Sequence, residues 1–292
     1  MKLCIVCGVK FNSVGWECPS CHHQPRRIDG FLAFSPESAE DNDSFEPHYF
    51  ELLVELESNH FWFRSRNQLV IWAIQQYFPK AKNFLEIGCG TGFVLSAIEK
   101  AFPGYTLYGS EIYSAGLNFA AKRLIRTNLF QMDARQIPFY NEFDIIGAFD
   151  MLEHIADDGL VLSQIYKALS QGGGIILTVP QHPFLWSLWD EMSRHKRRYT
   201  RRDLLNKVQD AGFKVLRITS FVTLLLPVLM VSRLRWRLRH RSGGRSEDLK
   251  DLNLSPLINT LFQRVCDIEG WILKKGLSFP AGGSLLCVGQ KE

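Results

Sequence analysis

The sequence lacks any apolar run long enough to cross a membrane. The longest candidate, FVTLLLPVLMV at 221–231, falls short of the ~18 apolar residues that a spanning helix needs. The N-terminus, MKLCIVCG, reaches a cysteine pair before the apolar region of a signal peptide could fit. These absences predict a cytoplasmic protein that does not span a membrane.

A strong net charge is also missing. The formal charge of +4 over 292 residues gives no general argument for binding nucleic acid. Hydrophobic residues make up 46% and charged residues 22% of the chain, which is typical of a globular protein. The length allows one large domain plus a small module.

The seven cysteines fall into two groups. Four follow the pattern C-x2-C-x10-C-x2-C, which can present four thiolates to one tetrahedral ion: Cys4, Cys7, Cys18 and Cys21. The spacing predicts a zinc ribbon over residues 1–34, folded by its metal and without an open coordination position. Two disulfides or four unrelated thiols are the alternative. We expect the remaining cysteines to be buried free thiols: Cys89, Cys266 and Cys287.

A second domain, expected over residues 47–292, follows a linker rich in Ser, Pro and acidic residues, SPESAEDNDSFEPHYF. Apolar residues at helical spacing predict two leading helices within 49–63 and 67–78. The predicted shared face of the second helix comprises Leu69, Trp72, Ala73, Gln76 and Tyr77.

Short β-type runs then alternate with helical stretches at 83–88, 93–102, 105–112, 116–124, 143–150, 161–169 and 174–180. Such alternation predicts a parallel sheet with helices on both faces, a doubly wound α/β fold. Residues 221–280 are expected to form a helical insertion near the C-terminus.

The segment FLEIGCGTGF places Gly88, Gly90 and Gly92 directly after the first predicted strand of this sheet. Bare backbone at the carboxyl end of a strand favours a bound nucleotide. A dinucleotide fingerprint would need glycine where Phe93 stands, and no Walker lysine and hydroxyl pair follows. Glu86 would repel a pyrophosphate but suits an ammonium or sulfonium group. The pattern therefore predicts a cationic ligand.

These features resemble the class I S-adenosylmethionine-dependent methyltransferases, of the type 11/12 kind. The resemblance covers residues 84–179 and depends on LEIGCGTG, an acid at the end of the second strand, MDA, FDMLEH and GGGIILTVP. It implies an enzyme with a Rossmann-like seven-stranded sheet and S-adenosylmethionine as cofactor. Glu86 and the glycine turn would hold the methionine portion.

The resemblance assigns three further acids to the cofactor site. Glu111 would accept both ribose hydroxyls, as a carboxylate can. Asp133 in MDA would take the adenine amino group with the Ala134 backbone beside it, and Asp150 in FDMLEH also belongs to this site. A solvated loop acid or a helix cap is the alternative for Glu111 and Asp133.

The implied reaction is an in-line displacement at the sulfonium methyl, in which the protein orients the acceptor and removes its proton. Candidate bases are His154, His182 and His195. His154 ranks first because it lies at the sheet end where the methyl should sit, although a histidine in a loop can also be purely structural.

His195 belongs to HKRRYT, whose basic residues could hold an anionic acceptor: Lys196, Arg197, Arg198, Arg201 and Arg202. In the alternative, the segment is an ordinary helix start, with Thr200 as its cap.

Methylation of a small-molecule or lipid-like acceptor is the leading function. RNA methylation is the second, because a zinc ribbon before such a domain also resembles certain ribosomal RNA guanine methyltransferases. The fourth strand lacks the Asn-Pro-Pro-aromatic signature of base amino-group methylation, which argues against that target but leaves ring-nitrogen and ribose targets open. A non-catalytic cofactor-binding or scaffold protein is the third. No feature of the sequence specifies an oligomeric state.

Residues 221–241 change from apolar to basic. Their first half is interrupted by Pro227, and the second half carries Arg233, Arg235, Arg237, Arg239 and Arg241. We expect a peripheral contact with anionic lipid on the inner face of the membrane. The alternative is a helix that packs over the active site as a lid, with solvated arginines.

Overall fold

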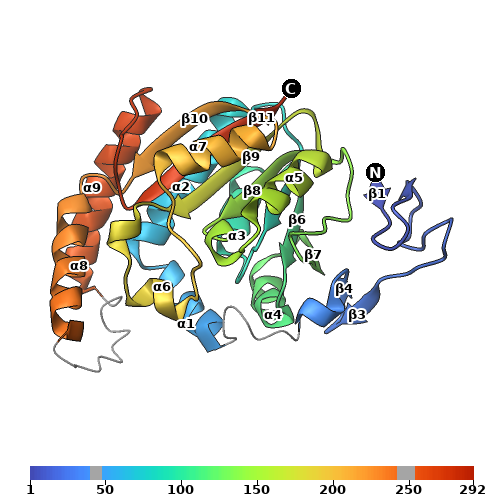
Figure 1. Cartoon of the computed structure of the whole chain (residues 1–292), viewed down its shortest axis with the longest axis horizontal. Coiled ribbons are helices and arrows are strands. Elements are labelled where there is room, and N and C mark those ends of the chain that lie inside the picture. Colours follow the sequence, from blue (N-terminus) through green and yellow to red (C-terminus); the bar gives the residue numbers. More distant parts are fainter. Residues whose placement is uncertain (40–47, 242–253) are drawn as a thin grey trace.

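The computed structural model describes residues 1–39, 48–241 and 254–292 (Figure 1). Its strands are β1 (Lys2–Leu3), β2 (Lys10–Phe11), β3 (Arg26–Ile28), β4 (Phe31–Ala33), β5 (Asn83–Ile87), β6 (Thr106–Glu111), β7 (Asn128–Gln131), β8 (Phe143–Phe149), β9 (Leu169–Pro180), β10 (Phe213–Phe221) and β11 (Ser284–Lys291). Its α-helices are α1 (His48–Glu57), α2 (Phe61–Tyr77), α3 (Phe93–Ala101), α4 (Ser114–Arg123), α5 (Asp158–Ala168), α6 (Leu188–Met192), α7 (Arg201–Asp210), α8 (Leu226–Arg241) and α9 (Pro256–Lys274). Short 3-10 helices are η1 (Pro36–Ala39), η2 (Leu152–His154) and η3 (Pro183–Leu185).

A large mixed sheet organises the molecule. In the described part of the chain it has nine strands, in the order β10-β11-β9-β8-β5-β6-β7-β4-β3. The strands β5 to β9 pair in parallel, whereas β11 runs antiparallel to both β9 and β10. The run from β10 to β7 is the expected seven-stranded Rossmann-like sheet, so the predicted α/β fold class is confirmed.

Helices cover both faces of this sheet and bury its apolar strands. One core lies under α5 and α7, and the other lies under α2, α3, α4 and α9. Phe84 and Phe143 are fully buried in strands that read as apolar runs, as expected for a parallel sheet covered on both sides. The carboxyl ends of β5, β6 and β8 therefore meet at one edge, where loops can form a binding site.

The N-terminal segment is packed onto this fold. The short sheet of β1 and β2 lies in the part that contains the first four cysteines, and Trp16 packs edge-on against Phe34 and Phe139, with ring centroids 4.5 and 5.4 Å apart. Strand β4 pairs in parallel with β7, so β3 and β4 extend the main sheet by two strands. The division into domains 1–34 and 47–292 stays a prediction.

Two details of the helices differ from expectation. Helix α2 begins at Phe61, because the His60 side chain accepts a hydrogen bond from the Trp62 N–H and caps it. Its buried side includes Val70 and Ile74 as well as Leu69 and Ala73, whereas Gln76 of the predicted face is exposed. This helix is apolar on more than one side, and its packing against α9 selects the face.

The apolar stretch near residue 227 is also arranged differently from the prediction. Pro227 does not interrupt a helix; it stands in the first turn of α8, where a missing N–H leaves no hydrogen bond unmade. Helices α8 and α9 lie together at the end of the molecule opposite the N-terminal segment (Figure 1). Within the described ranges, no helix is both long and apolar enough to span a membrane.

Candidate active site

The glycine turn after β5 has backbone conformations that side chains would disturb. Gly88 and Gly90 have φ of +70° and +51°. A Cβ on Gly88 would lie 2.5 Å from Met151 Cγ, whereas a Cβ on Gly90 would meet only Phe50 Cε1, at 3.9 Å. Gly88 therefore allows close packing, and Gly90 leaves open space above the turn for a ligand.

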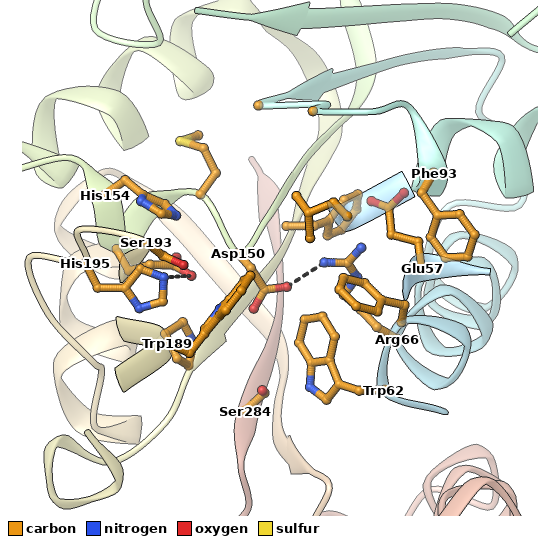
Figure 2. A pocket seen from close by; sticks show the side chains of 18 of the residues that line it. Glu57, Trp62, Arg66, Phe93, Asp150, His154, Trp189, Ser193, His195 and Ser284 are labelled. Carbon is orange, nitrogen blue, oxygen red and sulfur yellow. Dashed lines mark hydrogen bonds and ion pairs between the residues drawn. The ribbon is translucent and has the colours of Figure 1, made fainter. Parts of the chain in front are cut away.

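That open space belongs to a cavity of about 910 Å³. The glycine turn and the acids at the ends of β6 and β7 line one part of it, and apolar side chains of α8 and of the chain around α9 line another, among them Val228, Leu229, Leu254, Ile258 and Phe262. Trp62, Arg66 and Phe93 face the cavity from one side, and His154 and His195 from the other (Figure 2). The cavity is large enough for a nucleoside-sized ligand and a second molecule together.

Two buried glutamates bound the end at the glycine turn. Glu111 ends β6 and accepts hydrogen bonds from the backbone N–H of Gly90 at 3.0 Å and of Ile112 at 2.8 Å. Burial raises the pKa of Glu111, and these N–H groups oppose the rise. Burial also raises the pKa of Glu86 well above its ordinary value, against the opposing charge of Arg66. Glu86 Oε2 has no hydrogen-bond partner among the described residues.

Asp133, Ala134 and Asp150 also line the cavity, where the sequence predicted them. Asp133 is held by Arg135 through two nitrogen atoms, with Nε 2.9 Å from Oδ2. Asp150 follows β8 and accepts a hydrogen bond from Arg66 Nη1 at 2.9 Å (Figure 2). It also accepts one from the Thr178 hydroxyl at 2.7 Å. The cavity thus gathers all the acids assigned to the cofactor, although it pairs two of them with arginines.

The two histidines predicted as bases lie together, with ring centroids 4.7 Å apart. Burial and the charge of His195 lower the pKa of His154 to about 3, which makes it a weak base. His195 Nδ1 lies 2.8 Å from Asp190 Oδ1, and because a carboxylate only accepts, the ring donates from Nδ1 and presents Nε2 to its surroundings. On this geometry His195 is better prepared than His154 to accept a proton.

Asp190 is the buried centre of a network that the sequence did not reveal. It is 0% exposed and also accepts hydrogen bonds from Arg198 Nε at 2.7 Å and from the Ser187 hydroxyl at 2.6 Å. Burial acts to raise its pKa, but the bonds from His195 and Arg198 hold that pKa below its ordinary value. An ionised Asp190 can therefore fix the orientation of His195.

Of the other candidates, Lys196 and Arg198 line the cavity, whereas His182, Arg197, Arg201 and Arg202 do not. His182 stacks on Phe184 and does not line the cavity. Thr200 caps α7 by accepting from the Asp203 N–H, as the helix-start alternative expected. Arg197 pairs with Asp158, and Arg198 with Asp190, so these two guanidinium groups are already neutralised.

Sequence reasoning missed four polar residues of this region: Glu57, Arg66, Glu153 and Asp190. Glu57 accepts from the hydroxyl of Thr91 in the glycine turn at 2.6 Å, and it pairs with Arg123. Three of the four lie in helical stretches whose residue spacing gives no sign of a site. Glu153 had a signal, because it stands beside His154 in FDMLEH.

The first four cysteines converge as their spacing predicted. Their sulfur atoms all lie within 4.8 Å of one another, with Cys4 and Cys21 Sγ 3.6 Å apart and Cys7 and Cys18 Sγ 3.5 Å apart. All seven cysteines, which fall within the described residues, are free, and Cys89, Cys266 and Cys287 are buried as expected. Four thiols at this separation fit one tetrahedral ion.

The sheet order and the glycine turn at its carboxyl edge define a Rossmann-like, nucleoside-binding α/β protein. A protein family described as a methyltransferase domain matches residues 57–218, which is more than half of the chain. The chain therefore belongs to this methyltransferase family and is of the class I, S-adenosylmethionine-dependent kind.

Known proteins of this kind are similar over part of the chain. The ubiquinone biosynthesis O-methyltransferase of Pseudomonas putida is 27% identical over 122 residues, which cover 39% of this chain and 51% of that protein. The chain thus spans about half the length of the curated relatives it matches first.

Solved structures agree in fold. The complex between the Haloferax volcanii Trm112 methyltransferase activator and a putative methyltransferase contains a chain that is similar with a TM-score of 0.56 and 16% identity, over 86% of this chain and 98% of that one. Phosphoethanolamine N-methyltransferase 2 of Haemonchus contortus, bound to S-adenosylmethionine, is similar with a TM-score of 0.51 and 16% identity, over 77% of this chain and 52% of that one.

Proposed function

We propose that this protein transfers a methyl group from S-adenosylmethionine to a small-molecule or lipid-like acceptor with an apolar body. The observation that carries the proposal is the single cavity that joins the glycine turn to the apolar side chains of α8 and α9. A cofactor at the turn would direct its methyl along this cavity, so an acceptor that enters between the helices could meet it in line.

The residues at the turn fit the cofactor. Oε2 of Glu86 and Nε of Arg66 are buried and have no hydrogen-bond partner in the described part of the chain. They would bind the ammonium and the carboxylate of the methionine portion. Glu111 keeps lone pairs for the ribose hydroxyls, and Asp133, with the Ala134 backbone, would meet the adenine. Asp150 would hold Arg66 in place.

The part of the cavity that His154 and His195 line, which we call the acceptor end, contains the groups that can remove the acceptor's proton. The S–CH₃ bond breaks as the new bond to the acceptor forms, and the acceptor loses one proton. His195, oriented by Asp190, would take that proton, with His154 beside it as a neutral neighbour.

A peripheral contact with anionic lipid would deliver such an acceptor. Apolar side chains are exposed on α8 and α9 next to the cavity: Val228, Met230, Val231 and Leu234 on the first helix, and Leu257, Leu261, Ile268 and Trp271 on the second. Arg235 and Lys274 are exposed on the same two helices and could meet lipid phosphates. The predicted contributions of Arg237, Arg239 and Arg241 lie outside the side chains that the structure describes.

The four-cysteine cluster would hold one structural zinc ion in the N-terminal module. Metal analysis of reduced protein, prepared without chelator, should give one zinc per chain, and the double variant Cys18→Ser, Cys21→Ser should give none. A zinc content near zero in the unmodified protein would contradict the ribbon. The variant Cys266→Ser is the matched control, because this buried thiol lies in α9, apart from the cluster.

Transfer of labelled methyl into a fractionated cell extract tests the function. Label from S-adenosylmethionine should enter the lipid or small-molecule fraction when the protein is present. Label in the RNA fraction would favour the RNA methyltransferase instead, and no label in any fraction, with cofactor bound, would favour a scaffold protein. Glu111→Ala, which should weaken cofactor binding, is the control and should lower the transfer of label.

A further inference from the structure

Three potential metal ligands converge at the acceptor end of the cavity. Glu153 and His154 belong to η2, and His195 lies in the loop after α6. One donor atom from each lies within 4.8 Å of the other two. The pair of histidines lies on the side of the cavity opposite Arg66 (Figure 2).

The carboxylate of Glu153 shows that this cluster is incomplete. Glu153 is 0% exposed, and neither of its side-chain oxygens has a hydrogen-bond partner in the described ranges. A buried carboxyl group with both oxygens unsatisfied is costly, because it has given up water without replacing it. The surroundings of Glu153 therefore favour a cation.

His195 is held as histidine ligands usually are. Its Nδ1 donates to the buried carboxylate of Asp190 at 2.8 Å, and this contact turns Nε2 toward Glu153, 4.0 Å from Oε1. A carboxylate behind the imidazole is the common outer partner of a metal-bound histidine. Donor atoms that bind one ion at about 2.1 Å lie roughly 3–4.2 Å from each other. Each of the three side chains would therefore need to move its donor atom by well below 1 Å to bind a common ion.

We propose that Glu153, His154 and His195 bind one divalent transition-metal ion. Two imidazoles and one carboxylate suit such an ion and leave positions open, as in other sites with this ligand set. Those positions would face the cavity, where an acceptor oxygen could be held beside the methyl group. The role of the ion in holding the acceptor rests on the proposed function, whereas the binding of the ion does not. With the ion present, His154 and His195 act as ligands, and water takes the acceptor's proton.

Titration of the full-length protein with Mn²⁺ tests the site. Mn²⁺ prefers oxygen and imidazole to thiolate, so the four N-terminal cysteines should not compete. Loss of the free Mn²⁺ signal in electron paramagnetic resonance should show one ion per chain. His195→Ala and Glu153→Gln should each weaken binding at least about tenfold. His182→Asn, a change outside the cavity, should leave it unchanged.

Calorimetry with S-adenosylhomocysteine, without Mn²⁺, shows separately whether each variant is folded and whether the cofactor end works. Absence of Mn²⁺ binding to unmodified protein that binds S-adenosylhomocysteine would overturn the metal site and leave the proposed function intact. Equal Mn²⁺ affinity in His195→Ala would place the ion elsewhere and overturn it as well. If a variant does not fold, the melting temperature serves as the test instead. Mn²⁺ should raise the melting temperature of the unmodified protein, and should raise that of Asp190→Asn to a smaller extent. No rise in the unmodified protein would count against the site.

Discussion

The two ends of the cavity are built in different ways. At the glycine turn, three acids stand at or just after the carboxyl ends of strands, within a few residues of a recognisable motif: Glu86 in β5, Glu111 in β6 and Asp133 after β7. At the acceptor end, the groups come from distant segments, with His154 in η2, His195 after α6, and apolar side chains from α8 and α9. The comparison teaches that the cofactor end follows from the sheet, whereas the acceptor end depends on how the helices pack over it.

The largest effect is expected at the cofactor end. Glu111→Ala removes the acceptor proposed for both ribose hydroxyls, at a cost of about 1.5–3 kcal/mol for hydrogen bonds to a charged group. Calorimetry should show S-adenosylhomocysteine bound roughly 10- to 100-fold more weakly. The exposed Glu191→Ala is the control. Unchanged affinity in Glu111→Ala would remove this residue from the cofactor site.

Arg66 tests whether α2 belongs to the same end. Arg66→Gln should weaken S-adenosylhomocysteine binding about 30-fold, or roughly 2 kcal/mol, because the methionine carboxylate loses its charged partner. Binding of 5′-methylthioadenosine, which lacks the amino-acid portion, should change by less than about twofold.

Equal losses for the two ligands would mean that Arg66 acts only through its ion pair with Asp150, which spans 2.9 Å. Arg64→Gln is a matched control, since Arg64 bonds Gln263 of α9.

A pH dependence is expected from His60, which lines the cavity and caps α2. Burial, and then the charge of Arg64, lowers its pKa to about 4 from an ordinary 6.5. The unfolded chain therefore binds the proton more tightly. Stability is fully present above pH 6.5 and falls as the pH drops from 6.5 toward 4, by about 1–2 kcal/mol at pH 5.

Urea unfolding of wild type and His60→Asn at pH 7.5 and pH 5 measures this effect. Asn keeps a side-chain acceptor for the Trp62 N–H but does not titrate. The wild type should lose more stability than the variant between the two pH values. The same loss in both proteins would show that other groups cause it.

The smallest effect concerns the outer rim of the acceptor end. Arg235→Gln should weaken binding to anionic phospholipid vesicles by about 1 kcal/mol, or roughly fivefold, at low salt. Lys80→Gln, an exposed charge between α2 and β5, is the control. If the wild-type protein stays in the supernatant to the same extent with and without sedimented anionic vesicles, α8 does not bind lipid, and the alternative that it packs over the active site as a lid is favoured.

The sequence by itself determined the α/β class, the glycine turn, the acids at the strand ends and the four-cysteine cluster. These features depend on short-range rules: alternation of strand and helix, positive φ after a strand, and ligand spacing within one loop. Thr200 was visible as a helix cap for the same reason.

Tertiary structure alone decided which polar groups meet. Glu153 and His195 are separated by more than forty residues, and Asp190 and Arg66 stand in helical stretches that show no motif. Their contacts arise because α2, α6 and η2 pack over the same edge of the sheet. The exposure of Gln76 and the burial of Val70 and Ile74 show that local periodicity does not select the buried face of a helix when several sides are apolar. The arrangement of the acceptor end is therefore a property of packing, which no single segment encodes.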